Sequence, residues 1–176
     1  MENDKPFFQV VQERRSIRAF EKDELQDYDA VLDRILQVCD MAPSSGGFQS
    51  FEIYRVTSQE TKERLVPAAR DQAFIADAPL VLVFCANPAR SDFKYGERSK
   101  LFSVQDATIA AAYAQLAVQA LGLATVWVGA FDEARVSEIL KLPKDQRPVA
   151  ILPVGRAGER PKDKSTRGAQ DLLHAA

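Results

Sequence analysis

The chain has 176 residues, a length typical of one domain with a single sizeable core. Its 23 lysines and arginines against 25 aspartates and glutamates give a net charge of −2, which argues against nucleic acid or an anionic membrane as a partner. Because His174 is the only histidine, a histidine-based catalytic triad and a multi-histidine metal site are excluded.

The N-terminal region starts with ten residues that lack the apolar stretch of a signal peptide, so a cytoplasmic protein is expected. Phe7, Val10 and Val11 fall on one face of a short first helix. That helix runs into the arginine-rich stretch ERRSIRAF, residues 13–20.

A second helix is predicted from about Tyr28 to Met41, because apolar residues recur there every three or four positions, and Pro43 stops it. This helix contains Cys39, and the other cysteine, Cys85, lies in a later apolar run. Cysteines in such runs usually behave as small buried hydrophobic residues. Neither has CxxC spacing or a basic neighbour, so neither is expected to be reactive or bridged.

Strand and helix patterns then alternate. FEIYRVT, residues 51–57, is a predicted strand, and Thr57 with Glu60 has the spacing of a capping box for a third helix that reaches about Ala69. Alternatively, the helix ends earlier, at Pro67. PLVLVFCA, residues 79–86, is apolar on both faces, which is typical of a strand in the middle of a covered sheet.

Residues 87–106 form the longest polar stretch, and two interpretations stay open for it, a functional lid and a solvated connection. Phe93 and Tyr95 within it are candidates to stack on a flat substrate or on a nicotinamide.

The apolar stretch that follows, residues 107–131, has the length of a membrane span, but glutamines lie in its middle. A buried helix from Ala107 to Leu121 followed by the strand ATVWVGAF, residues 124–131, explains the composition better. Trp127 and Phe131 are predicted core residues.

The last predicted elements are a helix capped by Asp132 and the strand PVAILPVG, residues 148–155. The tail, residues 156–176, is basic and has almost no apolar residue before Leu172, so it cannot form its own core. It is either disordered or packed across something else, such as a partner subunit. No linker divides the chain, and residues 1–176 are therefore expected to form one domain.

The arginine-rich stretch is the first candidate site. Neither GxGxxG nor GxxxxGK[ST] follows a predicted strand, so a bound phosphate would have to be held by side chains. Arg14, Arg15 and Arg18 can pair with phosphate oxygens, and Ser16 adds a hydroxyl donor. The alternative is a surface patch in which the arginines pair with three acidic neighbours, Glu21, Asp23 and Glu24.

Five segments, in the same order, resemble the nitroreductase family of FMN-dependent oxidoreductases. They are RRSIRAF, APSSGGFQSFEIYRV, DQAFIADAPLVLVF, QDATIAAAYAQLAVQALGLATVWVGAFD, and LKLP followed by RPVAILPVGRAGERP. The resemblance covers nearly the whole chain. It implies an α+β fold, with a mostly antiparallel central sheet flanked by helices, and an intertwined homodimer with two FMN sites at the subunit interface.

The resemblance also implies roles for individual residues. Arg14, Arg15 and Ser16 match residues that hold the flavin phosphate and ribityl chain, and Arg18 matches a cation beside the pyrimidine end of the ring. The segment that reaches the flavin from the other subunit is matched by Pro43, Ser44, Ser45 and Gln49. The remaining matches are Gln72 for a polar ring contact, Val128 and Gly129 for backbone near the N5 edge, and Arg167 for the tail cation over the phosphate.

Four positions depart from the family pattern. Gly47 stands where asparagine is frequent, Ser50 and Phe51 replace a frequent proline and tryptophan, and Ser165 stands where a second tail lysine is often found. FMN binding is still expected with these departures, but they leave the identity of the substrate open.

The activity implied is ping-pong turnover, in which NADH or NADPH reduces bound FMN and the flavin then reduces a nitroaromatic, a quinone or a similar electron-poor acceptor. Since the flavin carries the hydride chemistry, no catalytic histidine, cysteine or carboxylate and no metal are expected. Two alternatives stay open. One is a specialised family member that performs reductive dehalogenation or flavin breakdown, and the other is a non-catalytic FMN-binding or redox-sensing protein.

Overall fold

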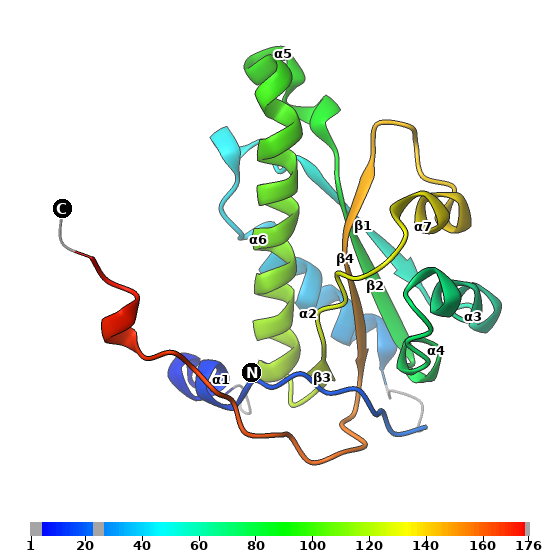
Figure 1. The fold of residues 1–176 in the computed structure, drawn as a ribbon, viewed down its shortest axis with the longest axis vertical. Coiled ribbons are helices and arrows are strands. Elements are labelled where there is room, and N and C mark those ends of the chain that lie inside the picture. The colour runs from blue at the N-terminus through cyan, green and yellow to red at the C-terminus, as the bar shows by residue number, and fades with distance from the viewer. Residues whose placement is uncertain (1–4, 23–26, 175–176) are drawn as a thin grey trace.

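The computed structural model describes residues 5–22 and 27–174, which form a four-stranded sheet between two layers of helices (Figure 1). The strand order is β1-β2-β4-β3, and every neighbouring pair is antiparallel. The strands are β1 (Phe51–Val56), β2 (Leu80–Ala86), β3 (Ala124–Thr125) and β4 (Arg147–Gly155). The predicted α+β class, with an antiparallel sheet flanked by helices, is confirmed.

The two faces of β2 belong to two hydrophobic cores, because successive side chains of a strand point to opposite faces. Leu80, Leu82 and Phe84 pack on the first core, which α2 (Tyr28–Asp40) and α6 (Ser99–Ala120) cover. Val81, Val83 and Cys85 pack on the second core, which three shorter helices cover: α3 (Gln59–Ala68), α4 (Phe74–Asp77) and α7 (Glu133–Leu140). Every residue of β2 is buried, as its continuous apolar sequence predicted.

One of the two predicted helix caps is confirmed, and the other lies one residue away from its predicted position. The Asp132 carboxylate accepts a hydrogen bond from the Arg135 backbone N–H at 3.1 Å and caps α7 as predicted. The prediction of Thr57 as the cap of α3 was wrong by one residue, since the Ser58 hydroxyl accepts from the Thr61 N–H. Pro67 lies in the last turn of α3 and does not shorten the helix.

The long helix α6 begins at Ser99, eight residues before the predicted Ala107. Ser99, Ser103 and Asp106 are buried on the same helix face as Ala110. Because these three residues are polar, the hydrophobic pattern did not indicate that this part of the helix is buried. The predicted polar stretch shortens to residues 87–98, which form the short turns η2 (Pro88–Arg90), α5 (Asp92–Tyr95) and η3 (Gly96–Arg98). No helix in the described ranges is long and apolar enough to cross a membrane.

The predicted strand 124–131 was too long, because only Ala124 and Thr125 pair with β4 as a strand. Val128 makes an isolated bridge with Ile151, and the residues around it form a connection to α7. Trp127 packs against the first core and Phe131 against the second, in agreement with their predicted core role.

Both ends of the chain leave the three layers at the same corner (Figure 1). Residues 18–21 pair with residues 156–159, where the Gly158 N–H donates to the Ala19 carbonyl at 2.8 Å. The helix α1 (Phe7–Glu13) buries only Val10, and its Phe7 and Phe8 rings are 64% and 77% exposed. Residues 160–174 of the tail are exposed, and the short turn η4 (Ala169–Asp171) is the one helical element among them.

Candidate functional site

The arginine-rich stretch lies along the edge of the sheet beside β3. Ser16 forms a parallel bridge with Thr125, whose carbonyl accepts from the Ile17 N–H at 3.2 Å. An extended segment alternates its side chains between two faces. Since Ile17 is buried, Arg15 shares its face, and Arg14, Ser16 and Arg18 occupy the opposite face. The stretch thus presents two guanidinium groups and one hydroxyl on one side.

Within residues 5–22 and 27–174, neither the Arg14 nor the Arg18 guanidinium has a hydrogen-bond or ion-pair partner. The surface-patch alternative therefore has no support from Glu21, while Asp23 and Glu24 lie outside the described residues. The backbone N–H of Arg18 donates to the Glu159 carboxylate at 2.5 Å. Unpaired guanidinium groups beside a hydroxyl are a donor set suited to a phosphate or another anion.

Arg15 has a different environment from its neighbours. Its Nη1 donates to the Gln12 carbonyl at 2.6 Å and to the Arg14 carbonyl at 2.9 Å. These carbonyls are at the end of α1, so Arg15 satisfies acceptors that the helix leaves free. Arg15 also lines a crevice between α1, the end of α6 and the tail.

Gln72 and the chain from Val128 to Gly129 lie together on the second-core side of the sheet. The Gln72 Nε2 donates to the Ala69 carbonyl at 2.8 Å and to the Ala130 carbonyl at 3.4 Å. Val128 exchanges two 3.0 Å backbone hydrogen bonds with Ile151, and Gly129 is exposed. Thr125 bridges the arginine-rich stretch, and residues 125–128 lead from there to this group. The two sets of predicted ligands therefore lie in one region of the structure.

The loop from Pro43 to Gln49 lies elsewhere. It packs against Asp106 in the first half of α6, whereas the arginine-rich stretch approaches the other end of that helix near Gln119. These two positions are 13 residues apart, or about 20 Å along a helix axis at 1.5 Å per residue. One chain therefore presents its predicted flavin ligands as two separate half-sites.

The conformation of this loop is unusual. Gly46, Gly47 and Gln49 have φ values of 61°, 75° and 49°, in the left-handed region. The Ser44 hydroxyl accepts from the Gln49 N–H at 3.0 Å, and the Gln49 side-chain amide donates to the Asp40 carbonyl at 2.8 Å. These contacts hold Gln49 against the end of α2.

Phe93 and Tyr95, the lid candidates, pack beside this loop. The Phe48 ring meets the Phe93 ring edge to face with centroids 5.2 Å apart, and it meets Tyr95 in the same way at 5.8 Å. Phe93 remains 78% exposed. The three rings form an aromatic ledge at the top of the molecule, defined as Phe48, Phe93 and Tyr95.

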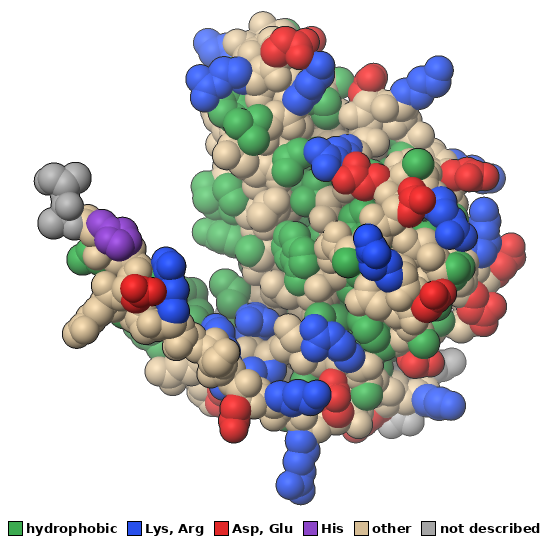
Figure 2. All heavy atoms as spheres, viewed as in Figure 1, with side chains coloured by type: hydrophobic (Ala, Val, Ile, Leu, Met, Phe, Trp, Pro, Cys, Tyr) green, Lys and Arg blue, Asp and Glu red, His purple; other side chains and the backbone are tan. Residues whose placement is uncertain are grey.

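Arg167 lies apart from both half-sites. Its Nε is 3.7 Å from the Asp171 carboxylate within the exposed tail, and the tail extends away from the body (Figures 1 and 2). Within the described ranges no hydrogen bond or ion pair joins Arg167 to the arginine-rich stretch.

Sequence reasoning missed two carboxylates that contact candidate residues. The buried Asp106 carboxylate binds the loop at Ser45 and Ser50, and Glu159 binds the backbone of Arg18. Asp106 carried a detectable signal, because its three- and four-residue spacing to Ala110, Ala114 and Ala117 places a charge on a buried helix face. Glu159 had none, since its partner is 141 residues away.

The cysteines do not belong to the candidate site. Burial raises the pKa of the Cys39 thiol and of the Cys85 thiol to about 12, so both remain protonated and unreactive near neutral pH. Within the described part of the chain, no group of three or more histidine, cysteine, aspartate or glutamate side chains is placed to hold a metal ion.

Comparison with known proteins connects this geometry to a family. The model of the nitroreductase family matches residues 11–76 and 68–156. The FMN reductase [NAD(P)H] of Bacillus subtilis (strain 168) is 32% identical to the chain, over 92% of this chain and 70% of the relative. The oxygen-insensitive NADPH nitroreductase of Salmonella typhimurium is 30% identical, over 96% of this chain and 73% of the relative.

Solved structures agree with the sequence comparison. The structure of NADPH:FMN oxidoreductase from Vibrio harveyi complexed with NAD+ superposes with a TM-score of 0.87 at 27% identity, over 96% of this chain and 76% of that chain. Sequence and fold therefore agree over almost the whole length of the protein: the chain belongs to the nitroreductase family.

Proposed function

We propose that the protein is an NAD(P)H-dependent FMN oxidoreductase whose two flavin sites form only when two copies of the chain pair. The observation that carries this proposal is the separation of the predicted ligands into two half-sites about 20 Å apart along α6. One subunit supplies the arginine-rich stretch, Gln72 and Gly129, and the other supplies the loop from Pro43 to Gln49.

The residues of the first half-site fit FMN. The Arg14 guanidinium has no protein partner in the described ranges, and a planar guanidinium pairs with a phosphate in bidentate fashion. The Ser16 hydroxyl on the same face is a further donor, and Arg167 of the tail completes the set in this proposal. Arg18 is a second unpaired cation, and a cation near the pyrimidine end of the flavin favours the form that carries negative charge there.

FMN, when bound, supplies the hydride chemistry between a nicotinamide and an electron acceptor. The protein's contribution is binding and orientation, which agrees with a site that contains guanidinium, hydroxyl and amide groups. The aromatic ledge offers exposed ring surface, and Phe93 contributes most of it. We assign this ledge to the contact with a flat, electron-poor acceptor such as a nitroaromatic or a quinone.

Exposed apolar surface supports the homodimer. Phe7 and Phe8 of α1 and Leu172 and Leu173 of the tail are all more than half exposed. A separate groove between the loop and α6 is lined by Pro43, Val104 and Ile109. Hydrophobic side chains also gather along the edge of the body that faces the tail (Figure 2). In the proposed dimer, α1 and the tail (residues 156–176) pack on the partner and cover this surface.

A mixing experiment tests the shared site. Arg14→Ala with Arg18→Ala disables the first half-site, and Gly46→Val disables the second, so each purified variant should be colourless. Subunits exchanged between the two variants by mild denaturation and refolding should regain about one quarter of the wild-type flavin, because half of the random pairs are heterodimers with one intact site.

A mixture that stays colourless, although the wild-type protein treated in the same way is yellow, would contradict a shared site. The activity is tested on the wild-type protein, whose 450 nm absorbance should bleach when NADH or NADPH is added without oxygen and return when a quinone follows. A wild-type protein that takes up no FMN would overturn the proposal.

A further inference from the structure

Asp106 is a buried carboxylate that fixes the loop at two points. Asp106 lies in α6 and is 1% exposed. One carboxylate oxygen accepts from the Ser45 N–H at 2.8 Å and from the Ser45 hydroxyl at 3.0 Å, and the other accepts from the Ser50 N–H at 3.1 Å. The carboxylate thus holds the residues at both ends of the left-handed stretch.

No cation neutralises this carboxylate, because no lysine or arginine in residues 5–22 and 27–174 forms an ion pair with Asp106. The three donors of the loop therefore stabilise its charge. The dependence is mutual, since the N–H groups of Ser45 and Ser50 would lose their acceptor in a buried place if the carboxylate were removed.

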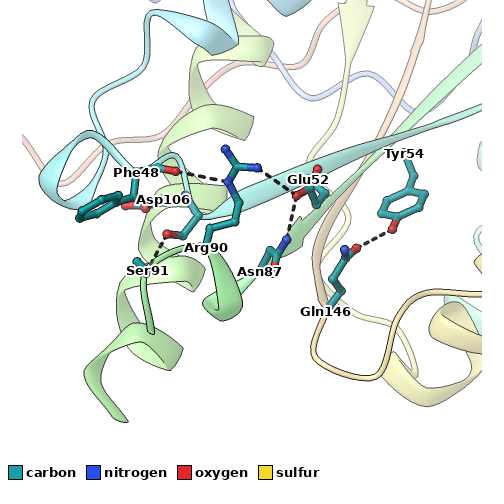
Figure 3. Close-up of polar contacts among 9 residues, drawn as sticks. Phe48, Glu52, Tyr54, Asn87, Arg90, Ser91, Asp106 and Gln146 are labelled. Carbon is teal, nitrogen blue, oxygen red and sulfur yellow. Dashed lines mark hydrogen bonds and ion pairs between the residues drawn. The ribbon is translucent and has the colours of Figure 1, made fainter. Parts of the chain in front are cut away.

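Residues 87–91 hold the same loop from its other side (Figure 3). The hydroxyl groups of Ser50 and Ser91, both buried, are 2.9 Å apart, and the Asn87 N–H donates to the Ser50 carbonyl at 2.9 Å. The Arg90 Nε donates to the Phe48 carbonyl at 3.3 Å. The ring contacts of Phe93 and Tyr95 with Phe48 add to these hydrogen bonds.

We infer that Asp106 is the positioning residue of the flavin-contacting loop, and that residues 87–98 support that loop as a buttress. The carboxylate holds Ser44–Gln49 in its binding conformation before the flavin arrives. This lowers the ordering cost that flavin binding would otherwise include. The inference rests on the proposed function, because it assumes that this loop contacts the isoalloxazine ring.

Affinities of the cofactor-free protein for FMN and for riboflavin test the inference. Asp106→Asn keeps the size of the side chain but turns one acceptor into a donor that faces an N–H. It should weaken the binding of both flavins by the same factor, about tenfold or more (about 1.4 kcal/mol). Arg14→Ala should weaken the binding of FMN alone, since riboflavin has no phosphate. Glu63→Gln, which alters an exposed carboxylate on α3 that accepts from the Gln59 side chain, is the matched control and should leave both affinities unchanged.

The measurements are made well below the melting temperature of each variant, so that a loss of global stability cannot imitate a loss of affinity. Wild-type affinity of Asp106→Asn for both flavins would overturn the inference and leave the proposed function intact. Wild-type protein that binds neither flavin would overturn the proposed function and the inference with it.

Amide hydrogen exchange of the cofactor-free wild-type protein gives an independent test that remains available if Asp106→Asn does not fold. The N–H groups of Ser45 and Ser50 should exchange slowly, at rates close to those of the neighbouring strand β1. Rapid exchange at both positions would show a loop that is not held before binding, and would overturn the inference.

Discussion

Gly46 and Tyr95 lie so close together that a Cβ atom on the glycine would be 2.3 Å from the tyrosine hydroxyl oxygen. The same Cβ would be 2.9 Å from a ring carbon of Phe48, and the φ of Gly46 is 61°. Gly46→Ala should therefore displace the loop and the aromatic ledge together. The left-handed backbone alone costs about 1–2 kcal/mol for a residue with a Cβ. We expect a lower melting temperature and at least tenfold weaker FMN binding, by about 1.4 kcal/mol.

Gly47 is the matched control for this substitution. Its φ is 75°, but a Cβ there would meet no atom within 4 Å. Asparagine tolerates the left-handed region better than other side chains, so Gly47→Asn should leave melting temperature and flavin affinity nearly unchanged. Equal losses in the two variants would show that the contact between Gly46 and Tyr95 is unimportant.

The phosphate contacts predict a colourless but folded protein. Arg14→Ala combined with Arg167→Ala should abolish FMN retention, because both cations proposed for the phosphate are lost, while circular dichroism and the dimer mass stay unchanged. Arg55→Ala is the control, because its exposed ion pair with Asp29 belongs to neither half-site. It should lower stability by at most about 1 kcal/mol and keep its yellow colour. Normal flavin content in the double variant would refute the assignment.

The aromatic ledge predicts a selective effect on the second half of turnover. Phe93→Ala should lower kcat/KM for quinones and nitroaromatics roughly 2- to 12-fold, the range of one aromatic contact, mainly through KM. Phe93→Tyr should restore it. The rate of flavin reduction by NAD(P)H, measured by stopped flow, should not change. An unaltered kcat/KM for every acceptor tested would leave Phe93 without a role in acceptor binding.

The buried thiols predict how stability depends on pH. Cys39 and Cys85 have folded pKa values of about 12 against an ordinary 9, and burial raises the pKa of Tyr28 from 10 to about 12. Groups with a raised folded pKa stabilise fully below their unfolded pKa and lose that contribution above it. The free energy of unfolding should therefore begin to fall near pH 9, with a slope that approaches about 1.4 kcal/mol per pH unit for each thiol at higher pH.

Urea titrations at pH 8, 9 and 10 measure this slope. The variant with Cys39→Ala and Cys85→Ala has no thiol to titrate, and its stability should fall less steeply over the same interval. Parallel slopes for the variant and the wild-type protein would contradict the raised pKa values.

The elements that sequence patterns predicted well are those whose burial is carried by their own apolar residues. The continuous run of β2 and the apolar stripe of α2 needed no knowledge of their neighbours. The start of α6 was missed because its first buried residues are serines and an aspartate, which are buried only through partners distant in sequence. The strand around Trp127 was overestimated because β-branched residues there pack on two cores without forming a ladder.

Some residues of the candidate site could likewise be predicted from the sequence, and others could not. Arg14, Ser16 and Arg18 could be named from the sequence because they carry the family motif, and their extended backbone follows from the bridge at Thr125. The support of the loop could not be named. Ser91 and Asp106 act through hydrogen bonds that span 41 to 61 residues, and such pairings leave no periodic trace in the chain.

The strand order has a consequence for the newly made protein as it leaves the ribosome. The last strand of the chain, β4, lies between β2 and β3, so its two neighbours emerge first and have no shared partner until residue 155 is available. Residues 18–21 find their partners later still, because they pair with residues 156–159. Until β4 is available, the edges of β2 and β3 that it will cover remain unpaired, and chaperones can shield them.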